Sequence, residues 1–214
     1  MIEAVGSLTR YIACGQVTKR PIFEFVSPKI RPNAACMVFP FEDDYSFGVL
    51  QSGVHWSWFV AKCSTLTERF RYTSDTVFDT FPWPQAPTSP QVLSVAEASR
   101  SLRAVRRRLM QESRLCLREL YRLTELPGEN PLKAAQTELD SAVKAAYGMD
   151  PKSDILSFLL ALNLNIASLE TSGGAVQGPG IPARVKDPQQ LISRDRVEMA
   201  GGPRLADVTS ALEL

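Results

Sequence analysis

Residues 43–64 read DDYSFGVLQSGVHWSWFVAKCS, and this stretch decides how the chain is layered. Apolar residues recur at helical spacing, and Asp43 or Asp44 can cap the first turn of the helix that this spacing predicts. The stripe consists of Phe47, Leu50, Val54, Trp58 and Ala61, and further apolar residues fall outside it. A helix that is apolar nearly all round is covered on more than one side. We therefore expect one long buried helix between a layer of strands and a second layer.

The residues upstream of this helix predict the strands. Residues 10–41 contain the short β-rich runs YIACGQV, PIFEFV and AACMVFPF, separated by several prolines. Proline removes a donor from the hydrogen-bond ladder, so these runs favour short strands joined by tight turns.

The residues downstream predict helices and a tail. Apolar spacings of three, four and seven indicate a long helix from about residue 92 to residue 123. Asn130 and Pro131 open a second helix that stops at Gly148, and a third spans residues 153–170. Short connections favour an antiparallel three-helix bundle. Beyond Thr171 the chain is poor in aromatics, which predicts an extended or partly disordered tail.

Together these segments predict an α+β fold with three parts. Residues 1–88 form a small β-rich domain with the buried helix, residues 89–172 form the helical domain, and residues 173–214 form the tail. The chain has 214 residues with a net charge of +1, so any basic surface must be local. No apolar run approaches the ~18 residues of a membrane span, and no signal peptide is apparent, so we expect a cytoplasmic protein without a membrane partner.

The sequence contains no recognisable active site. The single histidine, His55, lies inside the expected buried helix, where a packed core residue is the simpler interpretation. The acidic run at Glu42–Asp44 suits helix capping better than metal binding. The four cysteines are widely spaced, unlike zinc ligands, and no glycine-rich loop opens a helix to hold a cofactor. We expect no catalytic residue, metal or cofactor in this chain.

Binding chemistry is better represented than catalysis. Polar and basic side chains occur on turns, at Gln16, Thr18, Lys19 and Arg20, at Lys29 and Arg31, and at Arg69 and Arg71 around Phe70 and Tyr72. Such groups suit phosphate contacts with a few contacts to base edges, although ordinary solvated turns would look the same. Eight arginines between residues 97 and 122 form a second basic run, which either is solvated or faces phosphate.

The stretch FRYTSDTVFDTFPWP, residues 70–84, concentrates aromatic rings between prolines. It is either a corner of the core or a surface for a ligand. We expect its rings to pack back as a rigid hinge formed by Phe70, Phe81, Pro82, Trp83 and Pro84, with Phe78 alongside, because flanking prolines hold a ring in place at low entropic cost.

These motifs together resemble a known family. Asp44–Ser52, Phe70–Tyr72 and Phe81–Pro84 are similar to the helix, Phe-Arg-Tyr and Phe-Pro-Trp-Pro elements that end the target recognition domain of MmeI-like adenine DNA methyltransferases of types IIG and IIL. Residues 10–26 resemble the preceding strand pair. Leu139–Gly148 is similar to a motif of the family's C-terminal helical region, and the resemblance runs from about residue 10 to residue 170.

The resemblance implies recognition of a specific sequence in double-stranded DNA by an enzyme of a restriction–modification or phage-defence system. Such an enzyme methylates an adenine with S-adenosylmethionine. The family's cofactor pocket and Asn-Pro-Pro-Tyr motif lie upstream of this region and are missing here, so we expect a truncated fragment that is inactive alone and works with a catalytic methyltransferase domain or subunit. The alternative is a non-catalytic interaction module that docks on a separate methyltransferase subunit.

Each candidate residue has an expected role under the first interpretation. Gln16, Thr18 and Lys19 read base edges in the major groove, where amide and ammonium groups pair with A and G. The phosphate contacts come from Arg20, Lys29, Arg31, Arg69, Arg71 and Tyr72.

Overall fold

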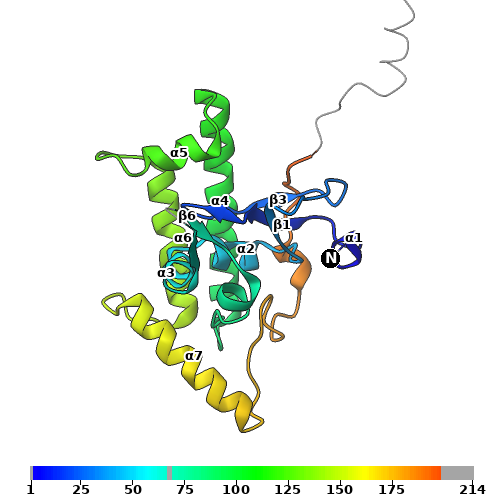
Figure 1. Ribbon diagram of the computed structural model, residues 1–214, viewed down its shortest axis with the longest axis vertical. Coiled ribbons are helices and arrows are strands. Elements are labelled where there is room, and N and C mark those ends of the chain that lie inside the picture. The colour runs from blue at the N-terminus through cyan, green and yellow to red at the C-terminus, as the bar shows by residue number, and fades with distance from the viewer. Residues whose placement is uncertain (1, 67–68, 199–214) are drawn as a thin grey trace, which may run out of the picture.

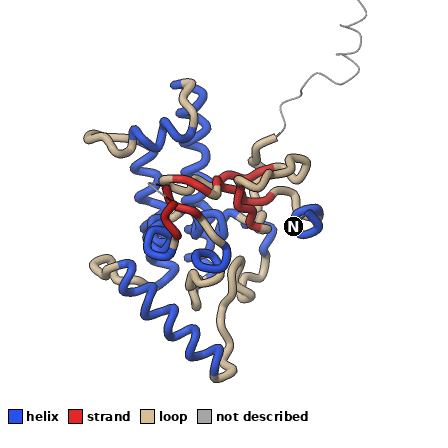
Figure 2. The backbone as a smooth tube through the Cα atoms, in the orientation of Figure 1, coloured by secondary structure: helices blue, strands red, loops and turns tan. Residues whose placement is uncertain are grey.

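The computed structural model describes residues 2–66 and 69–198 and has an α+β fold (Figure 1). The strands gather in a narrow band across the middle of the molecule (Figure 2). They are β1 (Tyr11–Gly15), β2 (Val17–Thr18), β3 (Glu24–Val26), β4 (Cys36–Phe39), β5 (Ser64–Leu66) and β6 (Arg69–Arg71). The helices are α1 (Ile2–Gly6), α2 (Asp44–Gln51), α3 (Gly53–Lys62), α4 (Ser89–Ser113), α5 (Leu117–Leu123), α6 (Pro131–Tyr147) and α7 (Ile155–Thr171), with short turns η1 (Ser74–Phe78) and η2 (Pro188–Leu191).

The strands form two antiparallel sheets that meet at Gln16. One sheet has the order β3-β1-β4, and the other has the order β2-β6-β5. The Gln16 backbone N–H donates to the carbonyl of Ala35, and its carbonyl accepts from the N–H of Tyr72, each at 2.8 Å. One residue therefore carries the chain from the first sheet into the second.

The expected single buried helix is two helices, which corrects the sequence-based prediction. Ser52 between α2 and α3 is extended, with φ −69° and ψ 158°, and its hydroxyl accepts from the N–H of His55. The Gly53 N–H donates to Asp140 Oδ1 at 2.7 Å. The backbone N–H groups of Gly53 and His55 at the break are therefore hydrogen-bonded. The acceptor for Gly53 is a side chain 87 residues away in the sequence. The cap at Asp43 is confirmed, since its side chain accepts from the Ser46 N–H.

Helix α2 packs against both α4 and α6. These two helices lie side by side and antiparallel, with Gln91 at the start of α4 bonded to Ala145 at the end of α6 (Figure 1). A Cβ on Gly48 of α2 would lie 2.7 Å from Val95 Cγ1 and 3.2 Å from Leu139 Cδ1. Glycine at position 48 thus permits a close approach that any side chain would obstruct.

The expected three-helix bundle is wrong in two respects. The long helix stops at Ser113 because Arg114 adopts a left-handed conformation, φ 57°, and the chain turns into α5. Helix α7 packs across α3 instead of joining α4 and α6, and the Asn163 amide donates to the carbonyl of Thr80 (Figure 1). The predicted starts and stops at Asn130, Pro131 and Gly148 are confirmed.

The segment predicted to be a loose tail packs on the fold as far as residue 198. Val185 and Leu191 are buried, and Val197 forms a parallel bridge with Val26 of β3. Residues 199–214 of the predicted tail lie outside the described residues. One hydrophobic core includes side chains from both sides of residue 88, so the strands and the helices share their buried surface. The proposed domain boundary at that residue stays a prediction.

A buried carboxylate joins the first strand, α2, α4 and the C-terminal segment. Asp44 is fully buried, and its Oδ1 lies 2.8 Å from Arg10 Nη2 and 2.5 Å from Arg103 Nη2. Its Oδ2 lies 2.6 Å from Arg100 Nε, and Ser193 donates to it from its backbone N–H at 3.1 Å. A charge in this position is tolerated because it is paired and hydrogen-bonded on all sides.

A second carboxylate, Asp195, completes this cluster. Arg103 Nε lies 2.8 Å from its Oδ2, and Arg10 Nη1 lies 3.1 Å from its Oδ1. Partial burial alone would raise the pKa of Asp195, but hydrogen bonds and positive charge from Arg103 and Arg10 hold that pKa well below its ordinary range. Asp195 therefore stays ionised, and its ion pairs with these arginines hold the C-terminal segment on the fold.

We predict that Asp44→Asn lowers the free energy of unfolding by about 3–5 kcal/mol, because it leaves buried guanidinium groups without their counter-charge. Urea denaturation followed by circular dichroism measures this loss. Glu112→Gln is the control, since it removes a carboxylate that is 63% exposed and 3.9 Å from Arg108. That exposed pair contributes at most about 1 kcal/mol. Equal losses in the two variants would show that the Asp44 cluster does not support the fold.

Candidate nucleic-acid interface

Strand pairing brings together three of the predicted contact residues. In the β2–β6 pair, Val17 lies opposite Arg71 and Thr18 lies opposite Phe70. Directly opposed residues have Cβ atoms about 5 Å apart. The backbones of Gln16 and Thr18 therefore lie near that of Arg71, although more than fifty residues separate Arg71 from them along the chain. The Thr18 side chain shares a face with Phe70, and the Arg71 side chain shares a face with Val17. Arg71 is exposed, whereas Gln16 and Thr18 are half-buried.

Some polar groups of the turn after β2 are hydrogen-bonded within the turn itself. The Thr18 hydroxyl donates to the carbonyl of Arg20 at 2.7 Å and accepts from the Arg20 N–H at 3.2 Å. Lys19, at the tip, is exposed. The Arg20 guanidinium lies over the rings of Tyr121, at 5.1 Å, and Trp56, at 5.8 Å. Lys19 is thus the freest of these groups, and Arg20 is partly engaged with the helices.

Lys29 and Arg31 lie apart from this turn. They follow β3, whose last residue, Val26, pairs with Tyr11 at the start of β1, and the Tyr11 hydroxyl donates to the carbonyl of Ile30. Gln16 follows the other end of β1. Five residues of strand span about 17 Å. The predicted residues therefore form two groups, one beyond each end of β1, and the side chain of Arg69 lies outside the described residues.

Tyr72 cannot contact a phosphate, which corrects its predicted role. Its side chain is fully buried, and its hydroxyl lies 3.0 Å from Nε2 of His55. Successive side chains of a strand point to opposite faces, so the exposure of Arg71 places Tyr72 in the core. Burial also lowers the pKa of His55 to about 3, which keeps the imidazole neutral. His55 is thus a core residue, as the sequence predicts.

The aromatic segment lies against the core. Phe81, Pro82, Trp83 and Pro84 are buried, whereas Phe70 and Phe78 are half-buried. The Trp83 ring lies 5.8 Å from that of Phe41 and 6.0 Å from that of Phe81, and the carbonyl of Pro82 accepts from the Tyr147 hydroxyl. These contacts join the segment to α6. Its action as a hinge stays a prediction.

The arginine run on α4 divides between the core and the surface. Arg106 is buried and bonds the carbonyl of Phe23 at 2.9 Å and Glu24 at 3.0 Å, so it is structural. Arg107 and Arg108 are 54% and 59% exposed. Arg100, Arg103 and Arg107 are three and four residues apart, so they share one face of the helix. Their partners, the carboxylates of Asp44 and Asp195, can be identified only from the fold.

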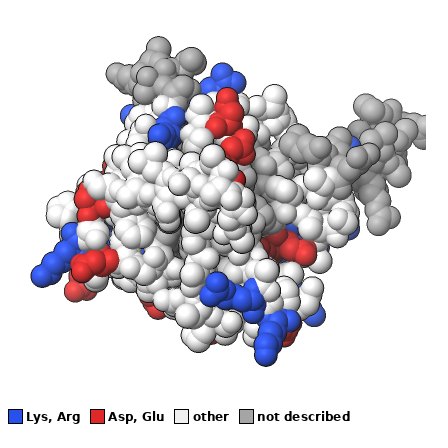
Figure 3. Space-filling view, turned by 90° about the horizontal axis from the view of Figure 1, so that it is seen from below, with Lys and Arg blue, Asp and Glu red and all other residues white. Residues whose placement is uncertain are grey.

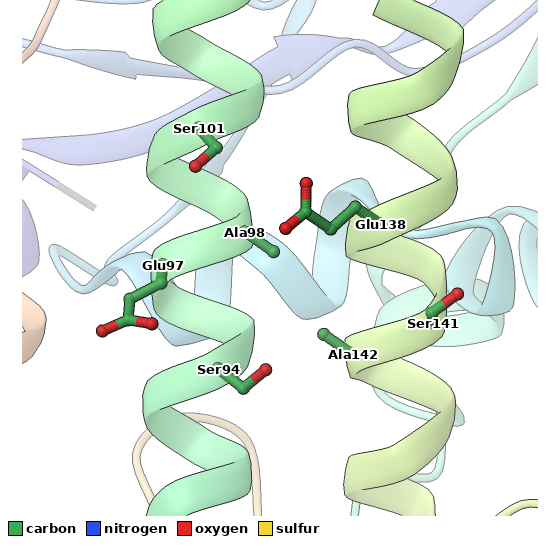
Figure 4. A pocket seen from close by; sticks show the side chains of 7 residues that line it. All are labelled: Ser94, Glu97, Ala98, Ser101, Glu138, Ser141 and Ala142. Atoms are coloured by element: carbon green, nitrogen blue, oxygen red, sulfur yellow. The ribbon is translucent and has the colours of Figure 1, made fainter.

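A groove of about 370 Å³ between α4 and α6 does not suit an anion. It is lined by serines and alanines with Glu97 and Glu138 (Figure 4). Figure 4 shows Glu138 pointing across the groove towards α4, whereas Glu97 points away from α6. The two carboxylates therefore do not face each other, and the groove would repel phosphate.

No group of three or more metal-binding side chains occurs in residues 2–66 and 69–198. Across that same part of the chain, every helix is too short or too polar to cross a lipid bilayer.

Comparison with known proteins shows what these features are similar to. The sequence model described as MmeI, target recognition domain, matches residues 20–85. DNA methyltransferase A of Bacillus subtilis (strain 168) is 32% identical over 103 residues, which are 48% of this chain and 11% of that protein. The fold is similar to the solved structure of the Type IIL restriction–modification enzyme MmeI in complex with DNA, with a TM-score of 0.67 and 25% sequence identity.

The structural similarity covers 76% of this chain and 22% of the MmeI chain. This chain spans less than a quarter of the length of either relative. The sequence match, the shared α+β fold and the motifs at Asp44–Ser52 and Phe70–Pro84 agree. The chain therefore contains an MmeI-like target recognition domain.

Proposed function

We propose that this chain recognises a specific sequence in duplex DNA as the target recognition and C-terminal portion of an adenine DNA methyltransferase. The observation that carries the proposal is the β2–β6 pairing, which sets Val17 opposite Arg71 and so brings the residues that flank β2, Gln16 and Lys19, near Arg71 at the border of the matched domain. Amide and ammonium groups on a turn can reach base edges in the major groove, while an arginine beside them holds a phosphate.

The chemistry of methyl transfer belongs, in this proposal, to a catalytic domain outside this chain. That domain would bind S-adenosylmethionine and receive an adenine flipped out of the duplex, since the target atom is inaccessible inside the stack. Restriction–modification is the biological context that the MmeI similarity supports. The role of this chain is to position the duplex through Gln16, Thr18 and Lys19 at the bases and Arg20, Lys29, Arg31, Arg69 and Arg71 at the phosphates.

We predict that Arg71→Ala weakens duplex binding and lowers the slope of log affinity against log salt concentration by about 0.9, because one phosphate contact is lost. Lys19→Ala weakens binding and reduces discrimination between base sequences. Fluorescence anisotropy over a salt series measures both effects.

Lys152→Ala is the matched control, because Lys152 is an exposed lysine on the turn before α7. If Arg71→Ala and Lys19→Ala behave like this control, the proposed interface is wrong. A wild-type chain that shows no salt-dependent binding to duplex DNA contradicts the proposed function itself.

An interaction module that docks on a methyltransferase subunit is the second candidate, and α7 favours it. Only Leu159 of its seventeen residues is buried, and Glu170 is its single charged residue. Leu164 is 70% exposed, and Leu160 and Leu169 are 39% and 38% exposed. Viewed from the side of α7, charged groups lie mainly around the margin of the molecule (Figure 3). Exposed apolar surface of this kind marks an interaction site.

If α7 is a docking surface, we predict that the isolated chain self-associates as its concentration rises, because the apolar face pairs when its partner is absent. Leu164→Glu then keeps the chain monomeric, since a buried unpaired carboxylate costs several kcal/mol. Sedimentation velocity measures the mass. Leu126→Glu is the control, because Leu126 is 56% exposed in the connection between α5 and α6. A wild-type chain that stays monomeric and binds DNA favours the first candidate.

A further inference from the structure

The region around Asp44 and Asp195 carries more positive charge than its carboxylates balance. Four arginines contact these two carboxylates: Arg10, Arg100, Arg103 and Arg107. The residues around Asp195 in the C-terminal segment add Arg194, Arg196 and Glu198. Six arginines against these three carboxylates and that of Asp43, which adjoins Asp44, leave an excess of two positive charges, whereas the whole chain has a net charge of +1. Lys29 and Glu42, which border the cluster, cancel each other.

The buried arginines and the exposed ones have different partners. Arg10 and Arg103 are 1% and 2% exposed and are committed to Asp44 and Asp195. Arg107 is 54% exposed, and its contact with Asp195, at 3.2 Å, engages one end of the guanidinium. A guanidinium carries five donors, so Arg107 keeps several for another ligand.

The C-terminal segment alternates bonded and exposed side chains. Ser193 and Asp195 bond Asp44 and Arg103, whereas Arg194 and Arg196 are exposed. Arg196 is held by Glu198, at 2.6 Å, and by the carbonyl of Thr9. Arg194 is exposed and makes no hydrogen bond or ion pair within the described residues. Ser193 and Asp195 thus fix the segment, and the donors of Arg194 are not engaged by any other described residue.

We infer that Arg107 and Arg194 bind phosphates of the DNA backbone and form a second contact region, which we call the arginine edge. The carboxylate of Asp195 holds the Arg107 guanidinium in one orientation, which lowers the entropy lost when an anion binds. Guanidinium groups pair with phosphate in bidentate geometry, so arginine suits this ligand better than lysine. The inference rests on the proposed function, because the ligand is the same duplex.

The position of the C-terminal segment is consistent with contact to that duplex. Val197 is bridged to Val26, which pairs with Tyr11 at the start of β1, whereas the Gln16 turn follows the end of β1. The two regions are therefore separated by the length of β1, about 17 Å. For a duplex whose axis runs along β1, this separation corresponds to about five base pairs, because phosphates on one DNA strand recur about every 3.4 Å of helix axis. The arginine edge would contact backbone about half a helical turn from the bases read by the turn.

The test compares Arg107→Gln and Arg194→Gln with Arg108→Gln in the full chain. Arg108 lies on the same helix, is 59% exposed and faces Glu112, so this control makes the same change in net charge. Anisotropy titrations with a duplex of mixed sequence over a salt series give the slope of log affinity. We expect each edge variant to lower the slope by about 0.9, and the double variant by about twice that, with equal effects on unrelated sequences. Arg108→Gln should leave the slope unchanged.

The outcomes separate this inference from the proposed function. Unchanged slopes in both edge variants, together with a lower slope in Arg71→Ala, overturn the arginine edge and leave the proposed interface intact. A wild-type chain without salt-dependent binding overturns the proposed function. A lower slope in Arg108→Gln equal to that of the edge variants also overturns the inference, because the effect would then follow net charge alone. Thermal unfolding of each variant shows whether its fold is retained.

Discussion

The fold depends on one buried carboxylate, that of Asp44. An unpaired charge at this depth would cost several kcal/mol, so the chain has to bring compensating donors to it. They come from Arg10 before β1, from Arg100 and Arg103 on α4, and from Ser193 in the C-terminal segment. The guanidinium of Arg10 also lies 3.5 Å above the ring of Phe25. Segments from the beginning, middle and end of the chain are thereby fixed around a single point, and hydrophobic burial fills the space between them.

This arrangement connects the core to the proposed DNA contacts. Arg10 is held in the charged cluster immediately before β1, and the turn at Gln16 follows the last residue of that strand. A strand paired on both sides transmits position from one end to the other with little freedom. The turn is held again by the backbone bonds of Gln16 to Ala35 and Tyr72. Side chains that must meet base edges within fractions of an ångström benefit from such support.

Local signals in the sequence predict several helix ends correctly, and contacts distant in sequence explain two of the errors. The caps at Asp43, Asn130 and Gly148 depend on neighbouring residues, so they can be predicted. The break at Ser52 depends on Asp140, and an apolar stripe continues through it without interruption. The C-terminal segment is poor in aromatics, as a loose tail would be, yet ion pairs hold Asp195 to arginines more than ninety residues away. Composition carries no information about such partners.

The same distinction applies to the candidate site. Polar residue types on turns identify Gln16, Lys19 and Arg71, but their proximity depends on strand pairing between distant segments. Tyr72 directly follows β6, and alternation places its side chain on the face opposite the exposed Arg71, inside the core. In the C-terminal segment, Asp195 is half-buried and paired with Arg103, whereas Arg194 beside it is exposed. The residue pattern of a strand therefore indicates which charges are structural and which remain available to a ligand, once one member of the strand has been placed.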